Sequence, residues 1–343
     1  MKFLRLAFYV LIAQLVLSGC AGEGVEETSS SEINFDAYLG RNASTRAGVT
    51  NIASLKKSGF GVFARYNHNG ATSSLMDNER VTWNGDRWGY TNTRYWPNEG
   101  SVDFYAFAPY LKNVELVNAP DSIKDNPTCI EFTSSTSPVD LVWDVQKNKT
   151  VPTSSTDGKV KFQFKHALAR LGFDITANQE LEENGAVIKV DSVKLYGDTI
   201  VNGAFDIKGY LNLENGGWSR PKDNTRVVYT WTPTGAEDGT NFKLSASQLD
   251  HTCSKIENAP NSYLCIIPQE KWVAFYLQIT YTVQQGTFKE EVKVKKNLLD
   301  VRKQPGVSNP SFPFEKGKAY VFHLILSLDP INFYVTTTVV DWK

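Results

Sequence analysis

Short runs of β-branched and aromatic residues, separated by clusters of turn residues, recur along this chain. Residues 160–164 and 188–196 alternate in side-chain character, as strands with one buried face do. Asn84 and Gly85 lie between two such runs, and this dipeptide favours the tight turn of a β-hairpin. No stretch sustains the apolar spacing of an amphipathic helix. We therefore expect an all-β fold built from sandwiches or barrels.

Composition and charge argue against several broad classes of protein. The chain has 343 residues, which fits two domains better than one. With 41% hydrophobic residues it can bury a core, which argues against wholesale disorder. Its 36 basic and 37 acidic residues leave a net charge of −1, which disfavours a nucleic-acid-binding surface. The 4 histidines leave little material for histidine catalysis or metal binding.

The first residues have the pattern of an export signal. A basic start precedes an apolar run over 6–17, which is shorter than the roughly 20 residues of a membrane span. The run ends in Leu17-Ser18-Gly19-Cys20, which resembles the lipobox of bacterial lipoproteins. The resemblance implies a signal peptide over 1–19 and lipid, palmitate included, on Cys20, which would attach the chain to a membrane. An ordinary secreted protein and a signal anchor are the alternatives.

Composition also indicates where domains begin and end. Residues 20–32 are small, acidic and serine-rich, which is typical of a flexible tether. Residues 152–158 form a turn-rich break. We expect an N-terminal β-sandwich over 33–157 and a C-terminal β-sandwich over 158–343, each of roughly seven strands.

Three cysteines remain beyond the one assigned to lipid. Cys253 and Cys265 are close in sequence, so a loop-closing disulfide could form in an oxidising compartment. The alternative is that these two and Cys129 are free thiols, with Cys265 a small core residue.

Sequence motifs of catalysis and metal binding are missing. Gly-x-Ser-x-Gly, His-Glu-x-x-His and phosphate-binding glycine patterns do not occur. The paired carboxylates Glu290 and Glu291 lie on an expected strand, where neighbours point to opposite faces and form no acid–base pair. His166 stands close to basic residues, and a structural histidine is the better interpretation. We expect no catalytic residue, no metal, no cofactor and no enzyme activity.

Trp83, Trp88 and Trp96 support an alternative function. Exposed, their rings could form a stacking platform for sugar, as in a glycan-binding surface lipoprotein of a polysaccharide-uptake system. Tryptophans near a hairpin more commonly fill cores and pair across strands. Glycan binding therefore stands as the rival to a structural role.

Several segments, taken in order, resemble the fimbrillin family of the Bacteroidales, the subunits of type V pili. Their order and spacing along the chain carry the resemblance more than any one of them does. The segments are Ile33-Asn34-Phe35, Ser44–Ala47, Leu55 with Ser58–Ala64 (matching the family's second strand), Tyr95-Trp96-Pro97, Val102–Pro109, Val139–Val142, Phe164–Leu171, Ile266–Gln269, Lys316–Tyr320 and Val340-Asp341-Trp342.

The resemblance implies two transthyretin-like β-sandwich domains and a role as a structural or adhesive subunit of a cell-surface fimbrium. Family members are exported as lipoproteins towards the outer membrane. A protease then cuts after an arginine, which Arg46 matches best and Arg41 matches as the alternative. The cut removes the first strand and the lipid and vacates an apolar groove. A strand from another pilus subunit fills this groove by β-strand addition.

The last segment of the chain, Phe333 to Trp342, is the candidate donor strand. Alternation places one set of its side chains on a single face. The alternative is that this segment is simply the last strand of the second sandwich. The candidate donor residues are Tyr334, Thr336, Thr338, Val340 and Trp342.

Overall fold

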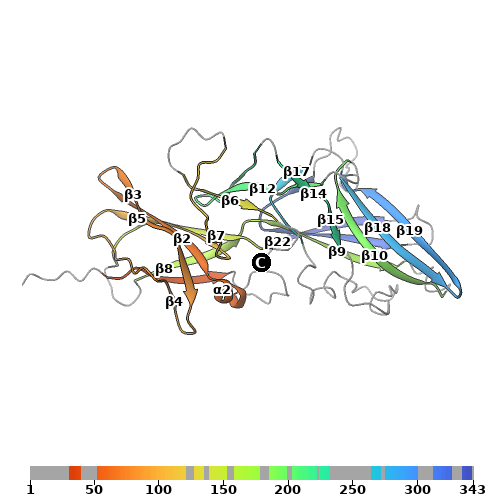
Figure 1. The fold of residues 1–343 in the computed structure, drawn as a ribbon, viewed down its shortest axis with the longest axis horizontal. Coiled ribbons are helices and arrows are strands. Elements are labelled where there is room, and N and C mark those ends of the chain that lie inside the picture. The colour runs from red at the N-terminus through yellow and green to blue at the C-terminus, as the bar shows by residue number, and fades with distance from the viewer. Residues whose placement is uncertain are drawn as a thin grey trace, which may run out of the picture. The chain divides into compact units, whose positions relative to one another are not determined.

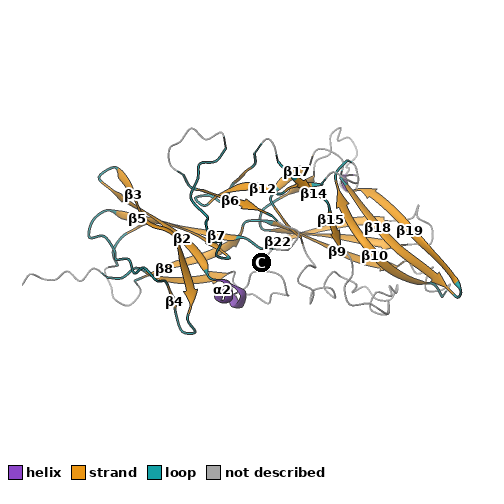
Figure 2. Ribbon diagram, viewed as in Figure 1, coloured by secondary structure: helices purple, strands orange, loops and turns teal. Residues whose placement is uncertain are grey.

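A computed structural model of the chain shows an almost wholly β fold, and the all-β prediction is confirmed. Strands, drawn in orange in Figure 2, make up nearly all of the regular structure that the model describes. The structure describes residues 31–39, 52–120, 127–134, 139–152, 158–177, 185–198, 203–221, 224–231, 264–271, 275–299, 312–326 and 334–341.

The largest sheet has seven strands in the order β1-β8-β7-β5-β2-β3-β4 (Figure 1). β1 is an edge strand and runs parallel to β8, whereas the other neighbouring pairs of this sheet run antiparallel. The strands are β1 (Asn34–Leu39), β2 (Phe60–His68), β3 (Ala71–Trp83), β4 (Trp88–Gly89), β5 (Ser101–Ala108), β7 (Val142–Lys149) and β8 (Lys159–His166).

The remaining strands form two four-stranded sheets, one three-stranded sheet and two short pairs. The four-stranded sheets are β15-β10-β18-β19 and β16-β9-β21-β22, and the three-stranded sheet is β13-β12-β6. The strands are β6 (Cys129–Thr133), β9 (Ala169–Ala177), β10 (Val187–Tyr196), β11 (Phe205–Asp206), β12 (Lys208–Asn212), β13 (Trp218–Ser219), β14 (Arg226–Val227), β15 (Tyr229–Trp231), β16 (Leu264–Ile266), β17 (Gln269–Lys271), β18 (Tyr276–Gln285), β19 (Phe288–Asn297), β20 (Phe312–Phe314), β21 (Lys318–Leu326) and β22 (Tyr334–Asp341).

Two hairpin turns follow the expected chemistry. Asn69 and Gly70 join β2 to β3, and both have positive φ, 49° and 77°. Residues 84–87, which include Asn84 and Gly85, join β3 to β4, where Trp83 pairs with Trp88. Because Gly85 carries the positive φ of 106°, the second turn confirms the hairpin predicted from the Asn-Gly dipeptide.

A short helix stands where the sequence indicated none. α2 (Ile52–Ser58) buries Leu55 and ends at Gly59, whose φ of 71° suits a residue just past a helix end. The amide of Gly59 donates to the Leu55 carbonyl at 2.8 Å. The prediction that Leu55 and Ser58 belong to the second strand is therefore wrong, because both precede that strand, which begins at Phe60. Seven residues are too few to show a helical period.

The described residues form three apolar core clusters. Residues of the seven-stranded sheet face two different clusters, because successive side chains of a strand point to opposite faces. One cluster contains β1 and β8 side chains, and the second joins β2 and β5 to β6 and β12. The third lies between the two four-stranded sheets, since it draws on β10 and β18 as well as on β9 and β21. Each cluster thus needs side chains from several elements.

The expected domain boundary falls between two paired strands. β7 lies before residue 157 and β8 after it, yet Val142 pairs with His166 and Trp143 with Lys165. Residues Glu32–Lys343 cluster as one compact unit, separate from Met1–Ser31. The division into sandwiches over 33–157 and 158–343, and their transthyretin-like character, stay predictions.

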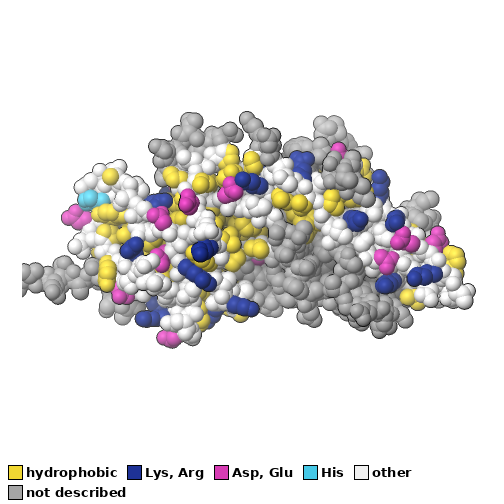
Figure 3. All heavy atoms as spheres, viewed as in Figure 1, with side chains coloured by type: hydrophobic (Ala, Val, Ile, Leu, Met, Phe, Trp, Pro, Cys, Tyr) yellow, Lys and Arg dark blue, Asp and Glu magenta, His cyan; other side chains and the backbone are white. Residues whose placement is uncertain are grey.

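The surface mixes charges of both signs. On the face drawn in Figure 3, Lys and Arg side chains lie among Asp and Glu side chains, as the net charge of −1 leads one to expect. Within the described ranges, no helix has the length and apolar character needed to cross a bilayer.

We expect stability to fall at alkaline pH through Tyr281. This side chain is 1% exposed, and burial raises its pKa to about 12. The ordinary pKa of tyrosine is 10, so the unfolded chain loses this proton at a lower pH than the folded chain does. The contribution of the buried, protonated Tyr281 to the unfolding free energy is therefore complete below pH 10 and is lost as the pH rises towards about 12. Denaturant titrations at pH 9 and pH 11 should show a smaller loss of unfolding free energy for Tyr281→Phe than for the native chain. An equal loss in both would contradict this, and Tyr95→Phe, which alters a half-exposed tyrosine, is the control.

Candidate functional site

β1 is an edge strand of its sheet, and every second side chain along it faces the core. Ile33, Phe35, Ala37 and Leu39 are 0, 2, 3 and 8% exposed, whereas Tyr38 on the opposite face is 47% exposed. The strand pairs with β8 alone over Asn34–Leu39, opposite Lys159–Phe164. β1 therefore fills an apolar groove and covers one edge of β8.

Aromatic rings surround the central side chain of β1. The ring of Phe35 lies 5.8 Å from that of Phe162 on β8 and 6.0 Å from that of Phe104 on β5. The rings of Tyr90 and Phe60 lie at 5.4 and 6.3 Å. These are the edge-on and offset arrangements that aromatic rings favour. Without β1, this pocket would expose apolar surface to water.

The segment around Tyr90 holds the N-terminal end of β1 on the side away from β8. The Tyr90 hydroxyl donates to the Ile33 carbonyl at 2.7 Å, and the Ile33 amide donates to the Arg94 carbonyl at 2.8 Å. Glu32 forms an isolated antiparallel bridge with Tyr95. We call this arrangement the Tyr90 latch.

The expected cut lies between β1 and the rest of the fold. Arg41 and Arg46 belong to residues 40–51, which lie outside the described residues, as does Cys20. The described chain resumes at α2. A cut after either arginine would therefore separate β1 covalently from every other described element. Cleavage and lipidation themselves stay predictions.

The three tryptophans of the glycan alternative take part in packing. Trp88 and Trp96 are 5% and 4% exposed, and the Trp96 ring lies 5.7 Å from that of Phe104. Trp83 is half-buried, 5.4 Å from the Trp88 ring, with the Lys56 ammonium 3.7 Å from its own ring centroid. A stacking platform needs free ring faces. The burial of Trp88 and Trp96 supports the core-filling interpretation instead.

Two of the family-like segments meet at a buried contact between a histidine and a carboxylate. His166 Nδ1 lies 3.0 Å from Asp140 Oδ1, and the two residues are 8% and 4% exposed. The Ala167 amide donates to the Leu141 carbonyl at 2.8 Å. A third segment joins them, since the Gly317 amide donates to the Leu168 carbonyl at 2.9 Å. His166 thus occupies a structural position, which agrees with our interpretation.

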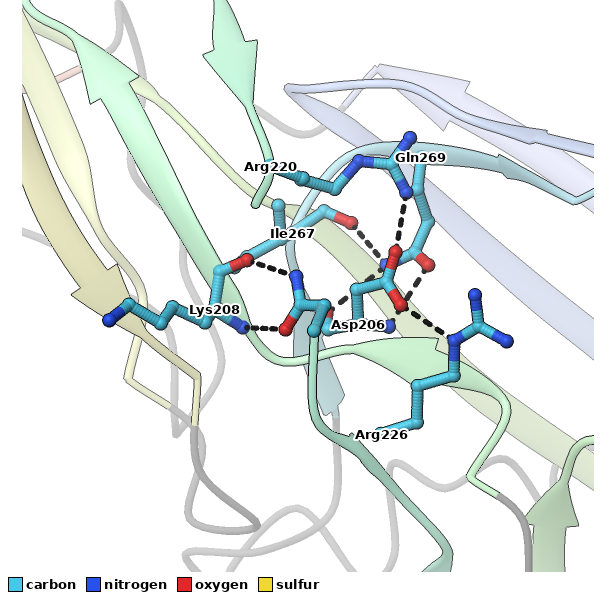
Figure 4. Close-up of polar contacts among 7 residues, drawn as sticks. Asp206, Lys208, Arg220, Arg226, Ile267 and Gln269 are labelled. Atoms are coloured by element: carbon cyan, nitrogen blue, oxygen red, sulfur yellow. Dashed lines mark hydrogen bonds and ion pairs between the residues drawn. The ribbon is translucent and has the colours of Figure 1, made fainter. Parts of the chain in front are cut away.

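A second polar cluster surrounds Asp206 (Figure 4). Its carboxylate, 9% exposed, accepts from Arg226 Nε at 2.6 Å and from an Arg220 terminal nitrogen at 2.8 Å. The Gln269 side chain accepts from the Asp206 amide at 3.1 Å and donates to the Ile267 carbonyl at 2.9 Å. The Asn224 side chain bonds both the amide and the carbonyl of Lys208. The Ile266–Gln269 segment thereby fixes β17 to β11.

The candidate donor strand lies on a sheet edge. β22 pairs with β21 from Lys318↔Asp341 to Ile325↔Tyr334, which includes Thr336, Thr338 and Val340. Val339, on the opposite face from these residues, packs partly buried against the core. Trp342 lies outside the described residues, and the use of β22 as a donor stays a prediction.

Cysteine pairing also stays a prediction. Cys129 and Cys265 are buried and hold free thiols, whereas Cys253 lies outside the described residues. Burial raises the pKa of both described thiols. Within the described ranges, Cys265 is thus a core residue of β16.

The hairpin signal near Tyr90 is a partial indication of the latch, whereas no local pattern indicates the Asp206 cluster. Tyr90 stands next to the predicted hairpin, but nothing in the local sequence places it beside β1. Arg220, Arg226 and Gln269 are 14, 20 and 63 positions from Asp206, so no local pattern joins them. Contacts of this kind follow from the topology of the sheets.

We expect Tyr90→Phe to loosen the N-terminal end of β1. The change removes the hydroxyl that bonds the Ile33 carbonyl while the ring remains, so the unfolding free energy should fall by about 1 kcal/mol. Hydrogen exchange should show faster opening at Ile33 and unchanged protection in β18. Tyr95→Phe, a half-exposed neighbour in the same segment, is the control. Equal protection at Ile33 in the native chain and in Tyr90→Phe would contradict the latch.

A comparison with protein families places most of the chain in one of them. The model of the fimbrillin-like family matches residues 45–342. The chain belongs to the fimbrillin-like family. The resemblance of the family-like segments is thereby confirmed. The matched range begins after β1, so the fimbrillin-like match itself leaves this strand out.

Individual relatives agree with the family assignment. The fimbrillin-like chain is 23% identical to the fimbrium subunit Fim1C of Phocaeicola vulgatus, over 97% of this chain and 95% of that one. A fimbrial protein from Bacteroides vulgatus has the same fold, with a TM-score of 0.61 and 22% identity over 91% of this chain and 99% of that one. A candidate cell adhesion protein from Bacteroides uniformis gives 0.53 and 17%, with coverage of 91% and 99%.

Proposed function

We propose that the chain is a structural and adhesive subunit of a cell-surface pilus, made as a lipoprotein precursor and assembled by strand exchange after N-terminal proteolysis. Membership of the fimbrillin-like family supports the pilus role, as does the likeness to a fimbrium subunit. The same support favours a surface location and a non-enzymatic role. The leader and the Leu17–Cys20 segment support export as a lipoprotein with lipid on Cys20.

The observation that carries the assembly proposal is the position of β1. An edge strand with three core-facing apolar side chains, and Ile33 as a fourth just before it, precedes both arginines of the expected cut. Loss of this strand would open the aromatic pocket around Phe35 and leave one edge of β8 without its backbone partner. A free edge beside an apolar groove accepts an added strand, because the addition satisfies both.

Other copies or other pilus subunits are the proposed source of the added strand, and β22 is the candidate donor. Among the described strands, β22 is bonded to β21 alone, so its release leaves the other strands of its sheet paired. Among the β22 side chains that the structure describes, Val339 is partly buried and Asp341 is exposed. An acceptor groove would replace the ladder that β22 forms with β21 in the precursor.

The test is a controlled cut. A variant carries the site of a sequence-specific protease in place of residues 41–46, and its mass distribution is measured before and after cutting. We expect monomers before cutting, and afterwards oligomers that have lost the β1 fragment. An added peptide of residues 31–40 should slow this assembly, whereas the same peptide with Phe35→Ala should not. Cut protein that stays monomeric and keeps its β1 fragment would contradict strand exchange.

A further inference from the structure

The tripeptide Ile-Asn-Phe occurs twice in the chain, at 33–35 and at 331–333. The first copy opens the strand that fills the groove, and its Ile33 and Phe35 are 0 and 2% exposed. The second copy leads directly into β22. The two bulky side chains that enter the groove first therefore recur, at the same spacing, at the start of the candidate donor.

We propose that residues 331–337 of a second copy of this chain enter the emptied groove in the register of β1. This inference rests on the proposed function. It adds which face of the donor strand enters the groove and which donor residue takes the place of each β1 residue. The face is opposite to that of Tyr334, Thr336 and Thr338. The correspondence is Ile331 for Ile33, Phe333 for Phe35, Val335 for Ala37 and Thr337 for Leu39.

The side chains of this register fit the positions that β1 defines. The Phe333 ring takes the place of the Phe35 ring among Phe60, Phe104 and Phe162, so the aromatic pocket is filled by an identical group. At the next two inward positions, a valine replaces the smaller alanine and a threonine replaces the larger leucine. Because the two changes are opposite in size, the total volume in the groove alters little. The threonine comes to the Leu39 position, which at 8% is the most exposed of the four.

The N-terminal end of the groove also accepts this register. In this register Pro330 takes the position of Glu32, two residues before β1. The hydrogen bond at this end comes from the next residue, since the amide of Ile33 donates to the Arg94 carbonyl. Ile331 supplies the same amide, and it supplies the carbonyl that the Tyr90 hydroxyl bonds in the precursor. A proline before it therefore forfeits neither of these two bonds.

The opposite face of the donor fits the groove poorly. If Tyr334 entered the Phe35 position, Asn332 would occupy the Ile33 position, which is 0% exposed, and an unsatisfied buried amide is unfavourable. If the strand moved two residues further, Thr336 would stand among the rings around Phe35 and leave most of that pocket empty. The Ile331 register avoids both costs.

Disulfide trapping distinguishes the two faces of the donor, because it compares two adjacent donor residues for cross-linking to one position on β8. Gln163 on β8 is exposed and pairs with Tyr38 of β1. In the proposed register Thr336 takes the position of Tyr38, whereas with Tyr334 in the Phe35 position Thr337 takes it. Two populations, one with Gln163→Cys and one with Thr336→Cys, are cut at the engineered site, mixed and oxidised. A parallel mixture uses Thr337→Cys.

All variants carry Cys253→Ser, so that this residue cannot form a competing disulfide. The two thiols that the structure describes, Cys129 and Cys265, are buried. Tyr38→Cys with Gln163→Cys in one uncut chain is the positive control, since this pair faces across the β1–β8 ladder. Mixing separate populations ensures that any disulfide joins two copies. We expect the Thr336 mixture to give at least ten times more disulfide-linked dimer than the Thr337 mixture.

The outcomes separate this inference from the proposed function. Cut protein without oligomers overturns both. Oligomers that trap through Thr337, or through neither position, overturn the register and leave strand exchange standing. A peptide of residues 330–338 gives a second readout that does not depend on how variant subunits fold. It should bind cut subunits at least tenfold more weakly with Phe333→Ala and less than threefold more weakly with Tyr334→Ala, and the reverse order contradicts the proposal.

Discussion

Replacing Phe35 by alanine is expected to lower the unfolding free energy of the uncut chain by about 3–5 kcal/mol. The side chain is 2% exposed and lies within ring-contact distance of Phe60, Phe104 and Phe162, so its removal leaves a cavity walled by rings that cannot close over it. The change should also release β1 without proteolysis, because this residue contributes most of the strand's aromatic contact. Denaturant unfolding and the mass distribution of the uncut variant measure the two effects.

Tyr38→Ala is the matched control for this substitution. Tyr38 lies on the same strand and is also aromatic, but it is 47% exposed on the face turned away from the groove. Its truncation should cost less than about 1 kcal/mol and leave the uncut chain monomeric. Equal losses for the two variants would show that the groove contributes little, and the assembly proposal would then lose its physical basis.

Asp206→Ala is the second large effect that we expect, at about 2–3 kcal/mol of unfolding free energy. Its carboxylate accepts from two guanidinium groups at 2.6 and 2.8 Å and is 9% exposed. Removal leaves Arg220 and Arg226 without this shared acceptor, although both side chains keep contact with water at 36 and 51% exposure. Thermal and denaturant unfolding of the uncut chain measure the loss.

Glu291→Ala provides the comparison for Asp206. Glu291 pairs with Lys293 at 2.7 Å, which is as short as the bonds of Asp206, but the two side chains are 56 and 60% exposed. Exposed pairs contribute less than about 1 kcal/mol. A loss in Glu291→Ala as large as that in Asp206→Ala would mean that burial of the Asp206 carboxylate does not set its contribution.

Local patterns in the sequence predicted the strands that bury one face. β8 alternates exposed and buried side chains over Lys159–His166, and residues 160–164 already showed this period. The Asn-Gly turns could also be predicted from the sequence, because glycine adopts a positive φ without steric cost, as Gly70 and Gly85 do here. The family-like segments predicted the first strand and its removal, and the structure places apolar side chains under that strand.

Features that depend on which elements meet could not be read from the sequence. Trp88 and Trp96 carry no sign of their burial, since an aromatic residue beside a hairpin can face either side of a sheet. α2 buries Leu55 in seven residues, which is too short for a period to emerge. The partners of Asp206 come from three segments that only the finished sheets bring together. Each of these is a consequence of topology rather than of local propensity.

Hydrogen exchange at the edge of β8 tests the central claim most directly. The Gln163 amide bonds Asp144 on the β7 side, so alternation turns the amides of Phe162 and Phe164 towards β1. We expect these two amides to be protected in the uncut chain, to exchange fast in freshly cut monomers freed of β1, and to regain protection in the assembled form. Oligomers in which Phe162 and Phe164 still exchange as at a free strand edge would contradict the refilling of the groove by a strand.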